Sequence, residues 1–144
     1  MMTENDSLTL KQLDTWIREG RALYVRTLLP KLVVSNIPRH QLRDYADIAR
    51  RVQMPTLIIR WLRPLIRSEK PVIPLASDGE KAIYALALSR IGAFNEATEI
   101  LTSLRLSKEP NVYYYLGLNA IEQWDFLSAL GPLKKYVTHN GISD

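Results

Sequence analysis

Apolar residues recur along this chain at intervals of three and four positions, which is the period of an α-helix. The clearest stripe consists of Leu42, Tyr45, Ala46, Ala49 and Val52. The one strand-like segment, residues 71–74, reads Pro-Val-Ile-Pro. Proline fixes φ and lacks an amide hydrogen, so two prolines in four residues predict a loop there. The pattern therefore predicts an all-α fold.

Glycines, prolines and polar turns divide this pattern into helices joined by short connections, and the interruptions include Gly20, Gly92 and the segment Gln53-Met54-Pro55. The eight predicted helices lie near residues 7–19, 21–35, 39–52, 56–69, 78–91, 94–106, 111–123 and 126–138. Short connections make neighbouring helices antiparallel, so we expect four hairpins. The hairpins span about 7–35, 39–69, 78–106 and 111–138. Pro30, Pro64 and the Gly131-Pro132 pair lie inside second helices and predict a bend or an early end, since an interior proline costs about 3 kcal/mol.

The last two hairpins match each other at a spacing of 32 residues. The pairs at this spacing are Phe94 with Phe126, Ala97 with Ala129, Leu101 with Leu133, and the small residues Ala85 with Gly117. Continued toward the N-terminus, the frame places Val25 and Ile58 opposite Ala97, at spacings of 33 and 39. The larger spacing reflects an insertion at residues 72–77.

These small and aromatic positions, with the turn residue Gly92 and with Pro110 at the end of a repeat, resemble the tetratricopeptide repeat (TPR) family. The resemblance is clear over about residues 78–138 and implies a right-handed helical-repeat solenoid. We expect residues 1–144 to form a single TPR-like domain, either whole or as the N-terminal part of a longer array. In this family the first helix of each hairpin lines a concave groove where partners bind.

Composition narrows the classes of protein. Of the 144 residues, 47% are hydrophobic, which is enough for a real core. The absence of cysteine and the wide separation of the two histidines, His40 and His139, exclude disulfides and argue against a metal site. The polar N-terminus is not a signal peptide, and no run is long enough to span a bilayer. We expect a cytoplasmic protein that does not bind membranes.

Nothing in the sequence suggests catalysis. It contains no phosphate-binding glycine loop, no His-Glu metal motif and no nucleophile elbow. Asp44 and Asp47 lie one helical turn apart, but the nearby Arg43, Arg50 and Arg51 favour a salt-bridged surface. We expect no catalytic residues, no cofactor and no enzymatic activity.

Charge is distributed unevenly along the chain. Residues 1–72 hold 13 Lys and Arg against 7 Asp and Glu, a net +6, whereas residues 73–144 hold 6 against 8, a net −2. Two arginine sets recur at helical spacing: Arg39, Arg43 and Arg50, and Arg60, Arg63 and Arg67. They form either solvated faces with local partners such as Asp44, Asp47 and Glu19, or a basic patch for an acidic partner.

Transferring the TPR groove to this chain selects the candidate partner-binding residues. They are Arg18, Arg43, Asp47, Arg50, Arg51, Leu86, Arg90, Tyr114 and Leu118. Such a groove is basic at one end and apolar at the other, so the expected function is a scaffold that binds a peptide or helix with acidic and apolar parts. The alternative is a nucleic-acid-binding helical array that uses the arginine-rich first half.

The last predicted helix, 126–138, carries an apolar face with no polar capping helix after it. Helical repeats need such a cap at their ends. Self-association through this C-terminal helix is therefore expected unless the array continues.

Overall fold

The computed structural model describes residues 9–70, 72–104, 113–115 and 117–118, and every regular element in these ranges is a helix. The α-helices are α2 (Leu10–Arg18), α3 (Ala22–Leu28), α4 (Leu42–Arg51), α5 (Pro55–Ile66), α6 (Asp78–Arg90) and α7 (Phe94–Ser103). Three 3₁₀ turns, η1 (Leu29–Lys31), η2 (Val34–Asn36) and η3 (Arg39–Gln41), lie between α3 and α4. The all-α prediction is confirmed.

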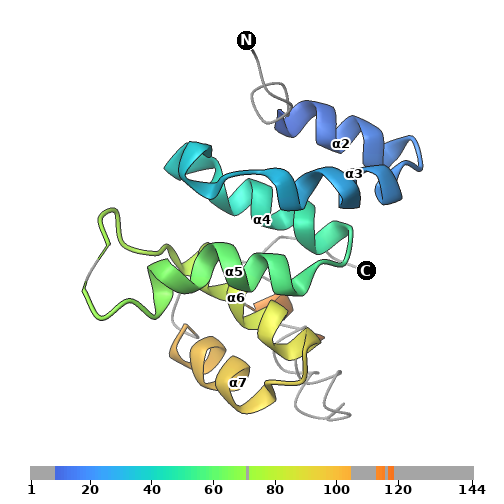
Figure 1. Cartoon of the computed structure of the whole chain (residues 1–144). Coiled ribbons are helices and arrows are strands. Elements are labelled where there is room, and N and C mark those ends of the chain that lie inside the picture. Colours follow the sequence, from blue (N-terminus) through green and yellow to red (C-terminus); the bar gives the residue numbers. More distant parts are fainter. Residues whose placement is uncertain (1–8, 71, 105–112, 116, 119–144) are drawn as a thin grey trace, which may run out of the picture.

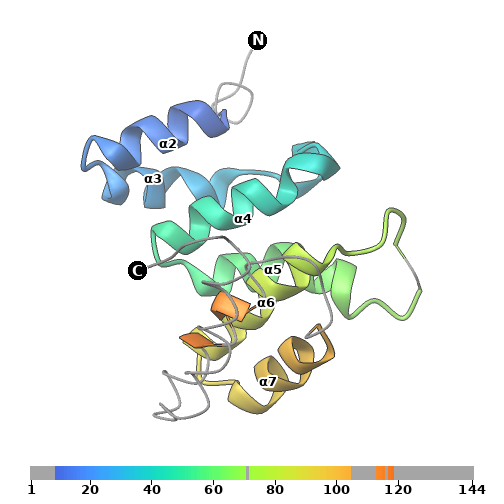
Figure 2. The ribbon, with the colours of Figure 1, turned by 180° about the vertical axis from the view of Figure 1, so that it is seen from behind.

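The helices pack as consecutive pairs, α2 with α3, α4 with α5, and α6 with α7. The first and second pairs meet through α2 and α4, whereas the second and third pairs meet through α6, which packs on α4 and more extensively on α5. Two layers result. In Figure 1 α3 and α5 lie in front of α4 and α6, and the order is reversed when the molecule is seen from behind in Figure 2.

The three helix pairs share one type of turn. Gly20, Gln53 and Gly92 each follow the first helix of a pair with positive φ, at 80°, 61° and 90°. In each turn this residue's amide donates to the carbonyl three residues back, and the next amide donates to the carbonyl five residues back, at 2.8–3.0 Å. This is the Schellman motif, in which a left-handed residue ends the helix and satisfies its last carbonyls.

The turn residues are separated by 33 and 39 positions, the same spacings that align the three helix pairs in the sequence. Measured from each turn, equivalent positions are buried in every pair. They are Leu13, Ala46 and Ala85 in the first helices, and Val25, Ile58 and Ala97, then Leu29, Leu62 and Leu101 after the turns. The six additional residues between the second and third pairs lie in the helices and not in an insertion at 72–77, because α5 and α6, of 12 and 13 residues, are longer than α3 and α4, of 7 and 10.

Several predicted helix boundaries were wrong. The helix predicted over 21–35 ends at Leu28 and continues only as the 3₁₀ turn η1, which contains Pro30. A proline lacks the amide that an α-helix requires, so the shortening predicted at this residue is confirmed. Pro64, by contrast, lies inside α5, which ends two residues later at Ile66. Most of hairpin 111–138, including Gly131-Pro132 and the proposed self-associating helix, lies outside the described residues.

Helix α6 lies at the centre of the described helices and is buried on nearly all sides, including every residue from Ala82 to Ser89. Its first turn carries a capping box: the Ser77 hydroxyl accepts from the Glu80 amide, and the Glu80 carboxylate accepts from the Ser77 amide. The same carboxylate, only 2% exposed, forms a two-pronged ion pair with Arg39 of η3, with 2.8 Å between Nη2 and Oε1. One buried acid thus caps α6 and joins it to the preceding pair.

The left-handed turn at Gln53 can be tested by substitution. Glycine adopts this conformation without the steric cost that a Cβ imposes, so Gln53→Gly should raise the free energy of unfolding by up to about 1 kcal/mol. Gly92→Ala should lower it by about 1 kcal/mol, since a Cβ at Gly92 meets no atom within 4 Å and only backbone strain contributes. Urea denaturation measures both; a Gln53→Gly variant less stable than the wild type would contradict the strain argument.

The Arg39–Glu80 pair provides a second test. Glu80→Gln keeps the shape of the side chain but leaves the Arg39 charge without its buried counter-charge, so we expect a loss of about 3–5 kcal/mol in unfolding free energy. Asp14→Asn, which removes a carboxylate from a more exposed pair of arginines, is the control and should cost much less. Equal losses in the two variants would show that burial does not set the strength of the Arg39–Glu80 pair.

Candidate partner-binding site

Helices α4 and α6 and the helical residues near 114 surround a hollow of about 440 Å³, here called the polar hollow. Its lining residues are Arg43, Asp44, Asp47, Arg50, Ile83, Tyr114 and Tyr115. Four of the residues predicted for the partner-binding groove therefore come together: Arg43, Asp47, Arg50 and Tyr114. Arg43, Asp47 and Arg50 lie on α4, and Tyr114 lines the same hollow from the helical residues near 114.

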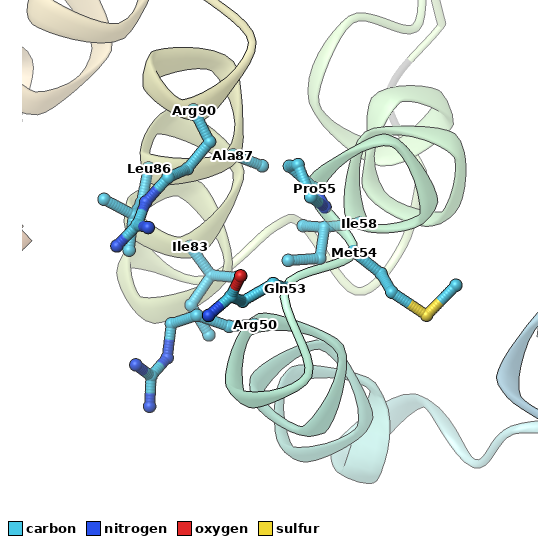
Figure 3. A pocket seen from close by; sticks show the side chains of 9 residues that line it. All are labelled: Arg50, Gln53, Met54, Pro55, Ile58, Ile83, Leu86, Ala87 and Arg90. Carbon is cyan, nitrogen blue, oxygen red and sulfur yellow. The ribbon is translucent and has the colours of Figure 1, made fainter. Parts of the chain in front are cut away.

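A second cavity of about 220 Å³, here called the apolar pocket, lies between α6 and the α4–α5 turn. It is lined by Arg50, Gln53, Met54, Pro55, Ile58, Ile83, Leu86, Ala87 and Arg90. Figure 3 shows aliphatic side chains between the helices, while the guanidinium groups of Arg50 and Arg90 extend to the same side of the pocket. Arg50 and Ile83 also line the polar hollow, so the two sites adjoin.

The turn between α4 and α5 is part of the apolar pocket. The sequence identified Gln53, Met54 and Pro55 only as an interruption between helices, yet all three line the cavity. Gln53 adopts the left-handed conformation that Gly20 and Gly92 adopt in the other two turns. Of the three turns, the one that borders the apolar pocket therefore carries a side chain, that of Gln53, although glycine adopts this backbone conformation more easily.

The arginines of the polar hollow are held in defined positions. Arg50 Nε donates to Asp47 Oδ1 at 2.7 Å. Partial burial acts to lower the pKa of the Arg50 guanidinium, but the Asp47 carboxylate outweighs it and the net shift is upward. Arg43 lies against Gly79 of α6, where an added Cβ would come within 2.7 Å of Arg43 side-chain atoms. Gly79 thus leaves the space that Arg43 occupies.

Two predicted groove arginines lie elsewhere, on either side of Asp14. Arg51 Nη1 donates to Asp14 Oδ1 at 2.7 Å, and Arg18 Nε lies 2.9 Å from Asp14 Oδ2. The hydrogen bond from Arg51 is the largest influence on the Asp14 carboxyl and helps to lower its pKa. Arg18 and Arg51 line neither cavity: Arg51 joins α4 to α2, whereas Arg18 pairs with Asp14 within α2.

The remaining predicted residues differ in accessibility. Leu86 is only 1% exposed, so it forms a wall of the apolar pocket and not an open contact surface. Tyr114 is half-buried and lines the polar hollow, with its ring centroid 5.7 Å from that of the buried Tyr115. Leu118 packs against the core and lines neither cavity.

Sequence reasoning missed the deeper members of the site. Ile58 and Ile83 are core residues whose outer atoms also border a cavity, and no sequence pattern separates them from their buried neighbours. Glu80 stands in a Ser-x-x-Glu segment, which signals a capping box. Its pairing with Arg39, 41 positions away, has no signal in the sequence.

Comparison with models of known families, with curated proteins and with solved structures finds no match for this chain. Within the described ranges, no helix is both long and apolar enough to cross a bilayer. No cluster of three or more His, Cys, Asp or Glu in those same ranges is arranged to hold a metal ion. The two cavities are lined by arginines, by the carboxylates Asp44 and Asp47, and by apolar side chains.

Burial raises the pKa of Tyr115 to about 12, from a usual value of 10.0. The unfolded chain releases the Tyr115 proton near pH 10. The protonated hydroxyl in the folded chain therefore contributes fully to the free energy of unfolding below pH 10, and this contribution is lost as the pH rises toward 12. Two pKa units correspond to at most about 3 kcal/mol. Tyr115→Phe should remove this part of the fall in unfolding free energy at alkaline pH, which urea denaturation between pH 9 and 12 measures. Tyr24→Phe, at an exposed ring, is the control; identical alkaline losses in wild type and Tyr115→Phe would contradict the assignment.

Proposed function

We propose that this chain is a TPR-like helical-repeat module that binds a partner protein through a peptide or helix. The observation that best supports a repeat architecture is the shared left-handed turn at Gly20, Gln53 and Gly92, with equivalent core positions at spacings of 33 and 39. Contacts between the first helices of neighbouring pairs agree with the same arrangement. A helical-repeat array of this kind offers an extended surface lined by its first helices.

The partner segment we propose carries an apolar residue next to one or more carboxylates. The apolar pocket is large enough for a single aliphatic or aromatic side chain, and Ile58, Ile83 and Ala87 would contact it. Arg50 stands at the junction of the apolar pocket and the polar hollow, and the bond it makes to Asp47 uses Nε. Its two terminal nitrogens can therefore donate hydrogen bonds to a partner carboxylate while Asp47 holds the side chain in place.

Selection from a displayed library of random peptides on the full chain would test this proposal. We expect selected peptides to share an apolar residue flanked by Asp or Glu. Arg43→Glu combined with Arg50→Glu should weaken the best peptide at least about a hundredfold, measured by fluorescence polarisation, because charge repulsion replaces attraction at the centre of the site. Unchanged affinity would exclude this surface.

Two further variants separate charge from shape. Arg26→Glu combined with Arg60→Glu changes the net charge equally but on α3 and α5, so peptide affinity should stay within a few-fold. Ala87→Leu fills the apolar pocket without changing charge and should weaken binding at least about tenfold. Circular dichroism of each variant controls for folding. A peptide that is insensitive to Ala87→Leu would show that the apolar pocket is not used.

A further inference from the structure

The exposed large apolar residues lie almost entirely outside the candidate site. Seven stand out in the described ranges, and six of them lie in α3, in the segment after it, or in the loop that joins α5 to α6. These six are Leu23, Tyr24, Val33, Val34, Ile73 and Leu75. Ile73 is 88% exposed, Leu23 77% and Leu75 71%, values far above those expected for side chains that pack within the fold. A set of this kind usually marks an interaction surface.

The stretches of sequence that contain α3 and α5 carry positive charge and no carboxylate, whereas the α5–α6 loop holds Glu69 between Arg67 and Lys70. Residues 20–43 and residues 48–68 contain no Asp or Glu, although each run contains five Lys or Arg. These runs include α3 and α5, which form one layer of the molecule (Figures 1 and 2). Carboxylates that pair with arginines, such as Asp14 and Asp47, belong to the first helices α2 and α4 instead. The layer of α3, α5 and the α5–α6 loop is here called the outer layer.

Two arginines of α5 and one directly after it form the centre of this charge. Arg60, Arg63 and Arg67 line an open hollow of about 520 Å³ with Thr56, Ile59 and Pro64. Arg67 pairs with Glu96 at 2.7 Å. Arg60 donates to the Pro30 carbonyl at 3.3 Å and Arg63 to the Tyr84 hydroxyl at 3.4 Å. The hydrogen-bond partners of these two cations are therefore neutral, and Arg63 also interacts electrostatically with Glu96. Their charge is therefore available to an anionic surface.

The apolar loop is held at its base. Arg39 Nη2 donates to the backbone carbonyls of Pro74 and Leu75, both at 3.3 Å, while the same guanidinium pairs with buried Glu80. The loop extends away from the helices in both views (Figures 1 and 2). Ile73 and Leu75 are thus presented to the outside by a network that is anchored in the core. Lys70 and Arg67, both exposed, precede them in the chain.

We propose that the outer layer binds the surface of a bilayer that contains anionic lipids. Ile73, Leu75 and Leu23 would enter the boundary between headgroups and acyl chains, and Arg60 and Arg63 would contact lipid phosphates. Stable association with a membrane surface generally requires two signals, an apolar one and a basic one, and the outer layer supplies both.

The aliphatic residues favour a bilayer over a nucleic acid. A nucleic-acid strand is held by basic side chains and by aromatic rings that stack on bases, so exposed aliphatic side chains contribute little to it. The Tyr24 ring is already covered by the Arg21 guanidinium, 4.9 Å from its centroid, and packs edge-on against Trp16. The expectation of no membrane contact rested on the absence of a spanning segment, which surface binding does not need.

Co-sedimentation of the full chain with lipid vesicles tests the proposal. We expect binding to phosphatidylcholine vesicles that contain phosphatidylserine, weak binding to phosphatidylcholine alone, and marked loss of binding in high salt. Arg60→Ser with Arg63→Ser should weaken binding about thirtyfold. Lys11→Ser with Arg18→Ser removes the same charge from α2 and should have a much smaller effect. Ile73→Ser with Leu75→Ser should weaken binding about tenfold or more.

The natural absence of cysteine allows a direct probe of insertion. Leu75→Cys or Lys11→Cys can be labelled at that position alone with a dye that reports polarity. Emission should shift to the blue on anionic vesicles for the label at position 75 and stay unchanged for the label at position 11. Because both positions are exposed, neither substitution should disturb folding.

Four results would overturn the proposal. One is no binding to anionic vesicles at physiological salt. Another is vesicle binding that is insensitive to both the arginine and the loop variants. A third is binding to a generic oligonucleotide, but not to vesicles, that depends on Arg60 and Arg63 and ignores Ile73 and Leu75. The fourth is self-association, detected by sedimentation velocity, that is abolished by the loop variant while vesicles remain unbound. The peptide-binding assay is independent of each result, since its site lies on α4 and α6.

Discussion

The buried carboxylate of Glu80 is the constraint on which much of this structure depends. It completes the capping box that begins α6, and it neutralises Arg39 at the start of the preceding helix pair. Because a buried charge is tolerated only with a well-placed partner, the two groups fix where α6 begins relative to α4. That position places Gly79 against Arg43 and puts Ile83 where both cavities meet. Arg39, which this carboxylate holds in place, also donates to the backbone carbonyls of Pro74 and Leu75 in the exposed α5–α6 loop.

A single local device is used three times to build the fold. Each first helix is followed by a residue in the left-handed conformation, where the chain reverses direction. The side chains five and nine positions after that residue are then buried in every pair. Two of the turns have glycine at this position, and glycine adopts positive φ without the steric cost of a Cβ atom. Gln53 is the exception, and it lies at the apolar pocket. The departure from the favoured residue thus coincides with the candidate site, as is common where function competes with local stability.

The two layers carry different chemistry. In the first helices, arginines are mixed with carboxylates, so Arg18, Arg50 and Arg51 are held by Asp14 and Asp47 in defined geometry. Such positioned charges suit the recognition of a particular partner segment. Arg60 and Arg63 of α5, by contrast, hydrogen-bond to neutral groups and belong to the same layer as an exposed aliphatic loop. An arrangement of this kind suits a broad anionic surface, so the proposed peptide and membrane contacts do not compete for the same residues.

The sequence by itself determined the helical class, the turns at Gly20 and Gly92, and the spacings of 33 and 39, because helical periodicity and turn chemistry are local properties. It also selected Arg43, Asp47, Arg50 and Tyr114, which line one hollow. Helix ends near Pro30 and Pro64 depend on more than the local sequence, since the cost of a proline competes with the free energy of packing against distant residues. Tertiary structure alone decided that Glu80 pairs with Arg39, that Arg18 and Arg51 hold Asp14 and do not line the site, and that Gln53 borders a cavity. Each of these outcomes depends on which distant side chains come within hydrogen-bonding or van der Waals distance, a property that no local pattern contains.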